Sequence, residues 1–116
     1  MPRYVLLRHD SPGGVHYDLM LHWGQVLRTW ALPEVPEPGK RLECRALEDH
    51  RLEYLDYEGP VSGERGTVAR FASGTFSVLQ QNDELLEVAL SGERLAGRLT
   101  LRRIEGRAGQ WQCDTV

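Results

Sequence analysis

The chain has 116 residues, of which 41% are hydrophobic and 27% are charged, and its formal net charge at pH 7 is -3. This length suits one compact domain and is too short for two, so we expect a single domain over residues 1–116. The acidic excess excludes binding of nucleic acid by bulk charge alone but leaves room for a local cationic site. No apolar run is long enough to span a membrane and the first residues do not resemble a signal peptide, so we expect a cytoplasmic protein.

The two cysteines, Cys44 and Cys113, lie far apart in the chain. A disulfide framework would need more cysteines, and a zinc site built from them would need closer spacing. We therefore expect two reduced thiols that fill space in the core.

Glycine and proline punctuate the chain, and the short runs between them have the spacing typical of sandwiches and barrels. No sustained period of 3.6 residues is present. Short helical turns are expected at 49–56 and 80–85. Strands are expected at 4–9, 16–23, 26–32, 42–47, 66–71, 75–79, 85–90, 98–104 and 110–113. The sequence therefore predicts a mainly β fold, a small single-domain β-barrel that is closed or nearly closed.

The strand expected at 16–23 carries a candidate metal site. His16 and Asp18 share one face of this strand with Met20 and His22, because side chains alternate between faces. His9 ends the preceding strand, just across a turn, and can approach as a third ligand. Such a polar stripe inside a barrel needs a reason, because unpaired buried polar groups are costly, and a divalent metal would supply one. The alternative is a solvent-exposed face with no metal.

A second cluster surrounds His50 and Tyr54, which share a face on either a helical turn or a strand. An imidazole beside a phenol offers donors to a phosphate oxygen or a leaving group. Glu48 and Asp49 precede this histidine and can hold or polarise it. The alternative is an amphipathic surface turn whose histidine is solvated.

Three segments together resemble the 3'-phosphoesterase domain of bacterial ATP-dependent DNA ligase D. They are 9–18, with the pattern H-x6-H-Y-D, 24–33, with W-A-x-P, and 48–59, with E-D-H-x-L-E-Y-x-D-x-E-G. The patterns are specific only in combination. Weaker collinear similarity continues to Gln110-Trp111, so the resemblance covers nearly the whole chain.

The resemblance implies a phosphoesterase dependent on manganese (Mn2+) or another divalent metal. Such a domain removes a 3'-terminal ribonucleoside and then the 3'-phosphate in DNA end repair. It also implies a barrel of about eight strands with short helical segments. Carried over by position, the metal ligands are His9, His16 and Asp18, the catalytic residues that contact phosphate are His50 and Tyr54, and supporting residues are Arg41, Glu48 and Asp49.

The sequence departs from the family pattern at three points. Met20 stands where the family has a phosphate-binding arginine, and Glu34 stands where it has a lysine. His9 and His16 are also one residue further apart than usual, which a bulge or a wider turn can absorb. Candidate replacement cations are His22, Arg51, Arg28 and Arg8.

Two other functions remain open. The barrel could act as a nucleic-acid or protein binding module with weakened catalysis, as Met20, Glu34 and the acidic charge suggest. It could also be a non-haem iron, cupin-like enzyme, because H-x-D with a distant histidine describes a facial triad.

The resemblance gives DNA or RNA–DNA 3' ends as the substrate. Because the chain carries no ligase or polymerase module, we expect separate ligase, polymerase or end-binding proteins, no membrane partner, and a monomer. Four arginines near the C-terminus either track a DNA backbone or are solvated residues paired with Glu93 and Glu105. They are Arg94, Arg98, Arg102 and Arg103.

Overall fold

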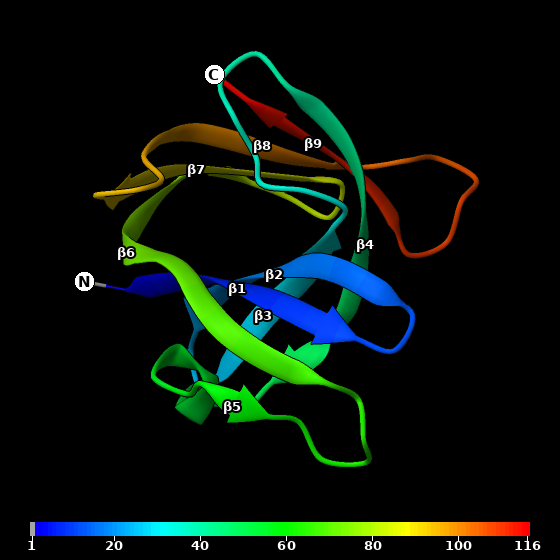
Figure 1. Ribbon diagram of the computed structural model, residues 1–116. Helices are drawn as coiled ribbons and strands as arrows, with labels where there is room; N and C mark the ends of the chain where they lie inside the picture. The colour runs from blue at the N-terminus through cyan, green and yellow to red at the C-terminus, as the bar shows by residue number, and fades with distance from the viewer. Residues whose placement is uncertain (1) are drawn as a thin grey trace.

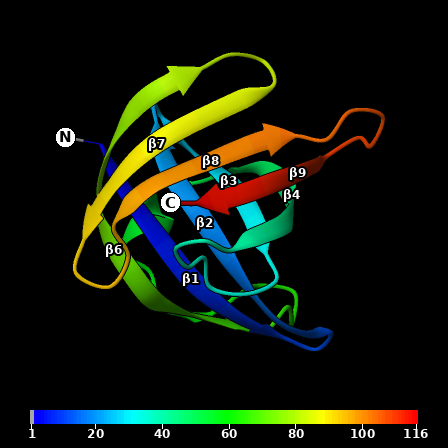
Figure 2. The same cartoon turned by 90° about the horizontal axis from the view of Figure 1, so that it is seen from above.

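The computed structural model describes residues 2–116, which form one antiparallel sheet of nine strands in the order β1-β2-β3-β4-β9-β8-β7-β6-β5 (Figure 1). β1 also pairs with β6, so eight of these strands close into a ring, and β5 extends the sheet beyond β6. Figure 2 shows β7, β8 and β9 passing across β1, β2 and β3 on the other side of the interior. The elements are β1 (Arg3–Ser11), β2 (Gly14–Trp23), β3 (Val26–Leu32), β4 (Arg41–His50), the 3-10 helix η1 (Leu52–Leu55), β5 (Gly59–Pro60), β6 (Thr67–Gln81), β7 (Leu85–Gly92), β8 (Gly97–Arg103) and β9 (Gln110–Thr115).

The predicted fold class, a small and mainly β barrel, is confirmed, with three corrections in detail. The strands expected at 66–71 and 75–79 are one 15-residue strand, β6. The helical turn expected at 80–85 is wrong, because β6 continues to Gln81 and a turn follows. The turn expected at 49–56 is reduced to η1, because β4 continues to His50.

Gly74 explains the error in β6. It falls in the gap between the two strands expected from the sequence, but it lies inside β6, paired with Tyr4 and Gly92. A Cβ atom there would lie 2.0 Å from the Ser91 carbonyl oxygen and 2.8 Å from the ring of Tyr4. The glycine therefore allows a close approach of neighbouring chains, which is a second reason for glycine in a strand.

The ring encloses the larger of two hydrophobic cores. Side chains from every strand of the ring meet there, and their largest buried members include Trp30, Tyr4, Phe76, Leu6, Leu19 and Leu21. Cys44 and Cys113 are buried in the same core as free thiols. Burial raises the pKa of each to about 12, in agreement with two space-filling cysteines.

The smaller core lies on the outer face of β1, β2 and β3. Its buried residues are Val5, Leu7, Met20, Leu27, Leu55 and Val68. Leu55 belongs to η1, so this helix covers the outer face. Arg3 of β1 donates to Asp56 at 2.7 Å, which fixes the end of η1 and holds the pKa of the Asp56 carboxyl below its usual value. This double coverage explains the continuous apolar run in β1.

Among residues 2–116, no helix has the length and apolar character needed to cross a bilayer.

Candidate active site

The predicted metal ligands lie on the outer face of the sheet, beside the smaller core. In the pairing of β1 with β2, His9 lies directly opposite His16, and Leu7 lies opposite Asp18. Leu7 belongs to the smaller core, and alternation places His9 and Asp18 on the same face. The expectation of a polar stripe inside the barrel is therefore wrong. The interior is filled by the apolar residues of the opposite face.

The longer spacing between the two histidines is absorbed by a tight turn and needs no bulge. Ser11 pairs with Gly14 at the end of the hairpin, which leaves two residues in the connection. The Ser11 hydroxyl also donates to the Gly14 carbonyl oxygen at 2.9 Å. The register then continues without a break, so the spacing places one ring directly across from the other.

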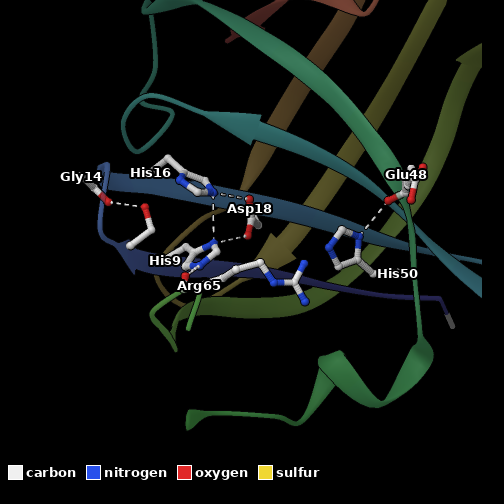
Figure 3. A network of polar contacts seen from close by, with 8 residues as sticks. His9, Gly14, His16, Asp18, Glu48, His50 and Arg65 are labelled. Carbon is white, nitrogen blue, oxygen red and sulfur yellow. Dashed lines mark hydrogen bonds and ion pairs between the residues drawn. The ribbon is translucent and has the colours of Figure 1, made fainter. Parts of the chain in front are cut away.

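The three predicted ligands converge (Figure 3). His9 Nδ1 lies 3.2 Å from His16 Nε2 and 3.4 Å from Asp18 Oδ2, while His16 Nε2 lies 3.1 Å from Asp18 Oδ1. One ligand atom from each residue falls within 4.8 Å of the other two. Two nitrogens and a carboxylate oxygen at this separation form one face of a coordination shell and leave further positions open.

A backbone carbonyl fixes the tautomer of His9. Its Nε2 lies 2.7 Å from the carbonyl oxygen of Arg65, which can only accept, so Nε2 carries the proton. In the neutral ring, the lone pair of Nδ1 then faces His16 and Asp18. This orientation by an outer partner is typical of histidines that bind metals.

The environment of Asp18 fits a bound cation. The residue is 3% exposed, and its Oδ1 has no hydrogen-bond partner among the described residues, because the 3.1 Å contact with His16 lacks hydrogen-bond geometry. A buried carboxylate oxygen without a partner is costly. A divalent metal between Asp18, His9 and His16 would satisfy this oxygen and would separate the two opposed imidazole nitrogens. The three residues therefore fit the implied metal.

A β-bulge directs His50 toward the same face. Leu27 and Thr29 of β3 pair with His50 and Leu47 of β4, so β4 has one extra residue between the two pairs. Without the extra residue, alternation would point His50 into the ring; with it, His50 shares the outer face with Leu47. Its Nδ1 donates to the Glu48 carbonyl oxygen at 2.8 Å, which leaves Nε2 available.

Tyr54 stands next to His50. The ring centroids are 5.6 Å apart in an edge-to-face arrangement, and Tyr57 meets Tyr54 in the same way at 5.5 Å. Tyr54 belongs to η1 and packs against the smaller core, of which the next residue, Leu55, is a buried member. The helical turn and the bulge thus place a phenol and an imidazole side by side.

A cavity of about 480 Å³ joins the two clusters. Of the predicted site residues, it is lined by His9, His16, Asp18, Glu48, Asp49, His50, Arg51 and Tyr54. Met20 also lines it but is 1% exposed and belongs to the smaller core. Arg51 is exposed and pairs with Glu53 at 2.9 Å.

The other predicted supporting residues lie elsewhere. Arg41 is at the beginning of β4, where its Nε donates to Asp114 at 2.8 Å. His22 is near the far end of β2, with its Nε2 3.0 Å from the Gly24 carbonyl oxygen. Neither lines the cavity, and the same holds for Arg8 and Arg28.

Two cations in the cavity were missed by the sequence reasoning, Arg45 and Arg65. Arg45 pairs with Ala31, which pairs with Asp18, so the three stand in one row across β4, β3 and β2. Strand register could have revealed Arg45. Arg65 comes from the loop before β6, and no local sequence pattern predicts that its carbonyl oxygen accepts a hydrogen bond from His9. In Figure 3 its side chain extends from below His9 toward the side of the cavity where His50 lies.

Comparison with known proteins decides the family. Residues 7–103 match the model of the DNA Ligase D 3'-phosphoesterase domain. The chain belongs to this family. The multifunctional non-homologous end joining protein LigD of Pseudomonas aeruginosa is 34% identical over an alignment of 121 positions, which covers 94% of this chain and 14% of the relative. The LigD DNA repair protein of Mycobacterium tuberculosis is 36% identical over 100 residues, which cover 78% of this chain and 13% of the relative.

The match to the ligase D phosphoesterase family includes every residue of the cavity, since all of them lie between 9 and 68. The chain spans about one seventh of the length of these relatives.

Proposed function

We propose that this chain is a metal-dependent phosphoesterase that removes a 3'-phosphate or a 3'-ribonucleoside from DNA or RNA–DNA ends during end repair. The observation that supports this most is the convergence of a candidate metal centre and the His50–Tyr54 pair on one cavity. Membership of the 3'-phosphoesterase family supports the same reaction class. In this proposal the domain acts as a monomer, and separate ligase, polymerase or end-binding proteins complete the repair.

His9 Nδ1, His16 Nε2 and the Asp18 carboxylate would hold the metal, and Mn2+ is the ion that we propose. When bound, it polarises a phosphate oxygen or activates water. The chain's own residues contribute the geometry. The Arg65 carbonyl keeps the His9 proton on Nε2, and burial keeps Asp18 away from competing solvent.

His50 and Tyr54 would contact the side of the phosphate that faces away from the metal. The Glu48 carbonyl holds the Nδ1 proton of His50, so Nε2 is the atom that can carry a proton to a phosphate oxygen or to the leaving oxygen. The Tyr54 hydroxyl would donate to the charge that develops on the phosphate. The backbone fixes the position of both groups, because the bulge in β4 orients His50 and the helical turn η1 carries Tyr54.

Arg45 and Arg65 would supply the positive charge that the family obtains from an arginine at position 20. Met20 can neither donate a hydrogen bond nor carry a charge. Glu34 does not repel the substrate from the cavity. It pairs with Lys40 at 2.5 Å in the loop before β4 and does not line the cavity. Because Glu34 lies outside the cavity lining, it gives no support to a binding module that has lost its catalysis.

The proposed roles can be tested by release of phosphate from an oligonucleotide with a 3'-phosphate in the presence of Mn2+. His50→Asn and Tyr54→Phe should each lower the rate by about 10²–10⁴ if they act in the transition state. His22→Asn is the matched control, because this histidine lies on the same strand as His16 and outside the cavity. Equal rates for His50→Asn and His22→Asn would contradict the proposal.

A further inference from the structure

A second hollow lies at the end of the ring next to the candidate active site. It encloses about 220 Å³, and we call it the rim groove; its principal lining residues are Arg28, Trp30, Asp49, Arg103 and Trp111. Leu47 and Asp49 of β4 line both this groove and the active-site cavity. The bulged end of β4 is therefore a shared wall between the two hollows.

The two arginines of the rim groove come from distant parts of the sequence. Arg28 alternates with Trp30 on β3, and Arg103 alternates with Leu101 on β8, so both point toward the inner face. The guanidinium of Arg28 lies 5.0 Å from the ring centroids of both Trp23 and Trp30. That of Arg103 lies 5.2 Å from the centroid of Trp111. Stacking on these rings holds the two cations in place.

The positive charge in the groove lacks a direct counter-ion. Among residues 2–116, neither guanidinium forms an ion pair or a hydrogen bond with a carboxylate. Burial lowers the pKa of Arg28, the charge of Asp49 raises it, and the charge of Arg103 lowers it. The two guanidinium groups line one groove without a carboxylate in contact with either of them, so an anion bound there would stabilise their charges.

We propose that the rim groove binds the phosphodiester backbone of the nucleic-acid strand whose 3' end enters the active-site cavity. A phosphate fits better than a base because Trp30 and Trp111 are only 1% and 4% exposed and cannot offer a free face for stacking. A stacked guanidinium still presents its planar edge of N–H donors, which matches a phosphate. The groove deepens the proposed function, because it gives the strand a path across β4 into the cavity.

The first test uses the unmodified protein. The sequence has three tryptophans, and each of them is in cation–π contact with Arg28 or Arg103. A single-stranded oligonucleotide with a 3'-hydroxyl should therefore change the intrinsic fluorescence in EDTA, where no metal chemistry takes place. Binding detected by fluorescence anisotropy of a labelled oligonucleotide, with no change in tryptophan emission, would overturn the proposal, as would the absence of binding at low salt.

The second test measures how the affinity depends on salt. In single strands, each phosphate contact contributes about 0.7 to the slope of log K against log salt, so Arg28→Gln/Arg103→Gln should lower the slope by about 1.4. Arg8→Gln/Arg107→Gln is the matched control with the same change in net charge, because these side chains pair with Asp10 and Glu43 and line neither the cavity nor the rim groove. Arg28→Lys/Arg103→Lys keeps the charges and should keep most of the slope. An equal slope in the glutamine variant and the control would overturn the proposal.

The results separate this inference from the proposed function. If the rim groove binds the backbone, the glutamine variant should raise the KM for an oligonucleotide with a 3'-phosphate and leave release from a nucleoside 3'-phosphate unchanged. If the parent shows no phosphatase activity but the glutamine variant still has the smaller salt slope, the role of the rim groove stands and the proposed enzyme activity is contradicted. If the parent and the glutamine variant release phosphate equally well from both substrates, the proposed function stands and the role of the rim groove is contradicted.

Discussion

His9 and His16 face each other across β1 and β2, with Nδ1 of one 3.2 Å from Nε2 of the other and the Asp18 carboxylate beside both. Two imidazole nitrogens this close need a proton or a cation between them. The neighbouring carboxylate has a buried oxygen without a hydrogen-bond partner among the described residues. The geometry therefore links the stability of this hairpin to the occupancy of the site.

We predict that Mn2+ stabilises the protein and that Asp18→Asn abolishes this effect. At a hundredfold excess over the dissociation constant, the metal should add about 2.7 kcal/mol to the free energy of unfolding. Without metal, Asp18→Asn should be at least as stable as the parent, because it removes a buried negative charge whose Oδ1 has no hydrogen-bond partner among the described residues. Thermal melting with and without Mn2+ measures both effects. An equal metal-dependent shift in the two proteins would contradict the assigned ligand.

The Arg65 carbonyl should contribute to metal affinity through its hydrogen bond to His9. Gly66, the next residue, has a φ of +96°, and a Cβ atom there would lie 1.8 Å from the Asp10 carbonyl oxygen. Gly66→Ala should therefore shift the loop and weaken metal binding by about 10–100-fold, as loss of an outer partner typically does.

Gly63→Ala is the control for that loop. Gly63 also has a positive φ, +74°, but an added Cβ would come no closer than 3.7 Å to the Arg65 side chain. It should cost stability without changing the affinity measured by isothermal titration calorimetry. Equal affinities in the two variants would show that the carbonyl does not orient His9.

Met20→Arg should give no tenfold gain in phosphate release, because Arg45 and Arg65 already line the cavity. The side chain of Met20 is buried in the smaller core, so the new charge should also lower the melting temperature. A gain of tenfold or more in a 3'-phosphate release assay would mean that Arg45 and Arg65 do not replace the arginine that binds the phosphate in the family.

Arg65→Gln tests the same question in the opposite direction. The substitution keeps the backbone carbonyl that accepts from His9 and removes the guanidinium. If this cation grips the phosphate, the rate should fall by about 10²–10³ while the metal affinity stays the same. Arg8→Gln, whose parent side chain lies outside the cavity and pairs with Asp10, is the control. A similar small loss of rate in both variants would show that the Arg65 guanidinium does not contact the phosphate during the reaction.

Both thiols should resist alkylation in the native protein. Burial raises the pKa of Cys44 and of Cys113 to about 12, so the reactive thiolate is scarce at pH 8. Iodoacetamide should modify neither residue at pH 8 and should modify both in denaturant, as mass spectrometry would show. Rapid native labelling would contradict their placement in the larger core.

The sequence was most informative where side chains alternate. The faces of β2 were predicted correctly, with Leu19 and Leu21 in the larger core and Met20 in the smaller one. Periodicity could not show which face is the inside of the ring, so His16 and Asp18 were expected on the wrong side of the sheet. That choice depends on η1, which turns the outer face of β1–β3 into a second buried surface.

The remaining errors have their origin in long-range pairing. Arg41 was chosen by position, yet the register of β4 brings Arg45 into the row of Asp18 and leaves Arg41 beside Asp114. The bulge that directs His50 outward is visible only in the pairing with β3. Arg65 reaches His9 from a loop that is 56 residues away in sequence. Local patterns contain none of these relationships.

The most direct test of the account is a gel assay with purified protein, Mn2+ and a primer–template that carries a 3'-phosphate or a single 3'-ribonucleotide. We predict metal-dependent trimming by the parent and none by His16→Ala, because His16 Nε2 is one of the three converging ligand atoms. Trimming that survives in His16→Ala would contradict the assigned centre. No trimming by a parent protein that Mn2+ still stabilises would contradict the enzyme and leave a barrel that binds metal.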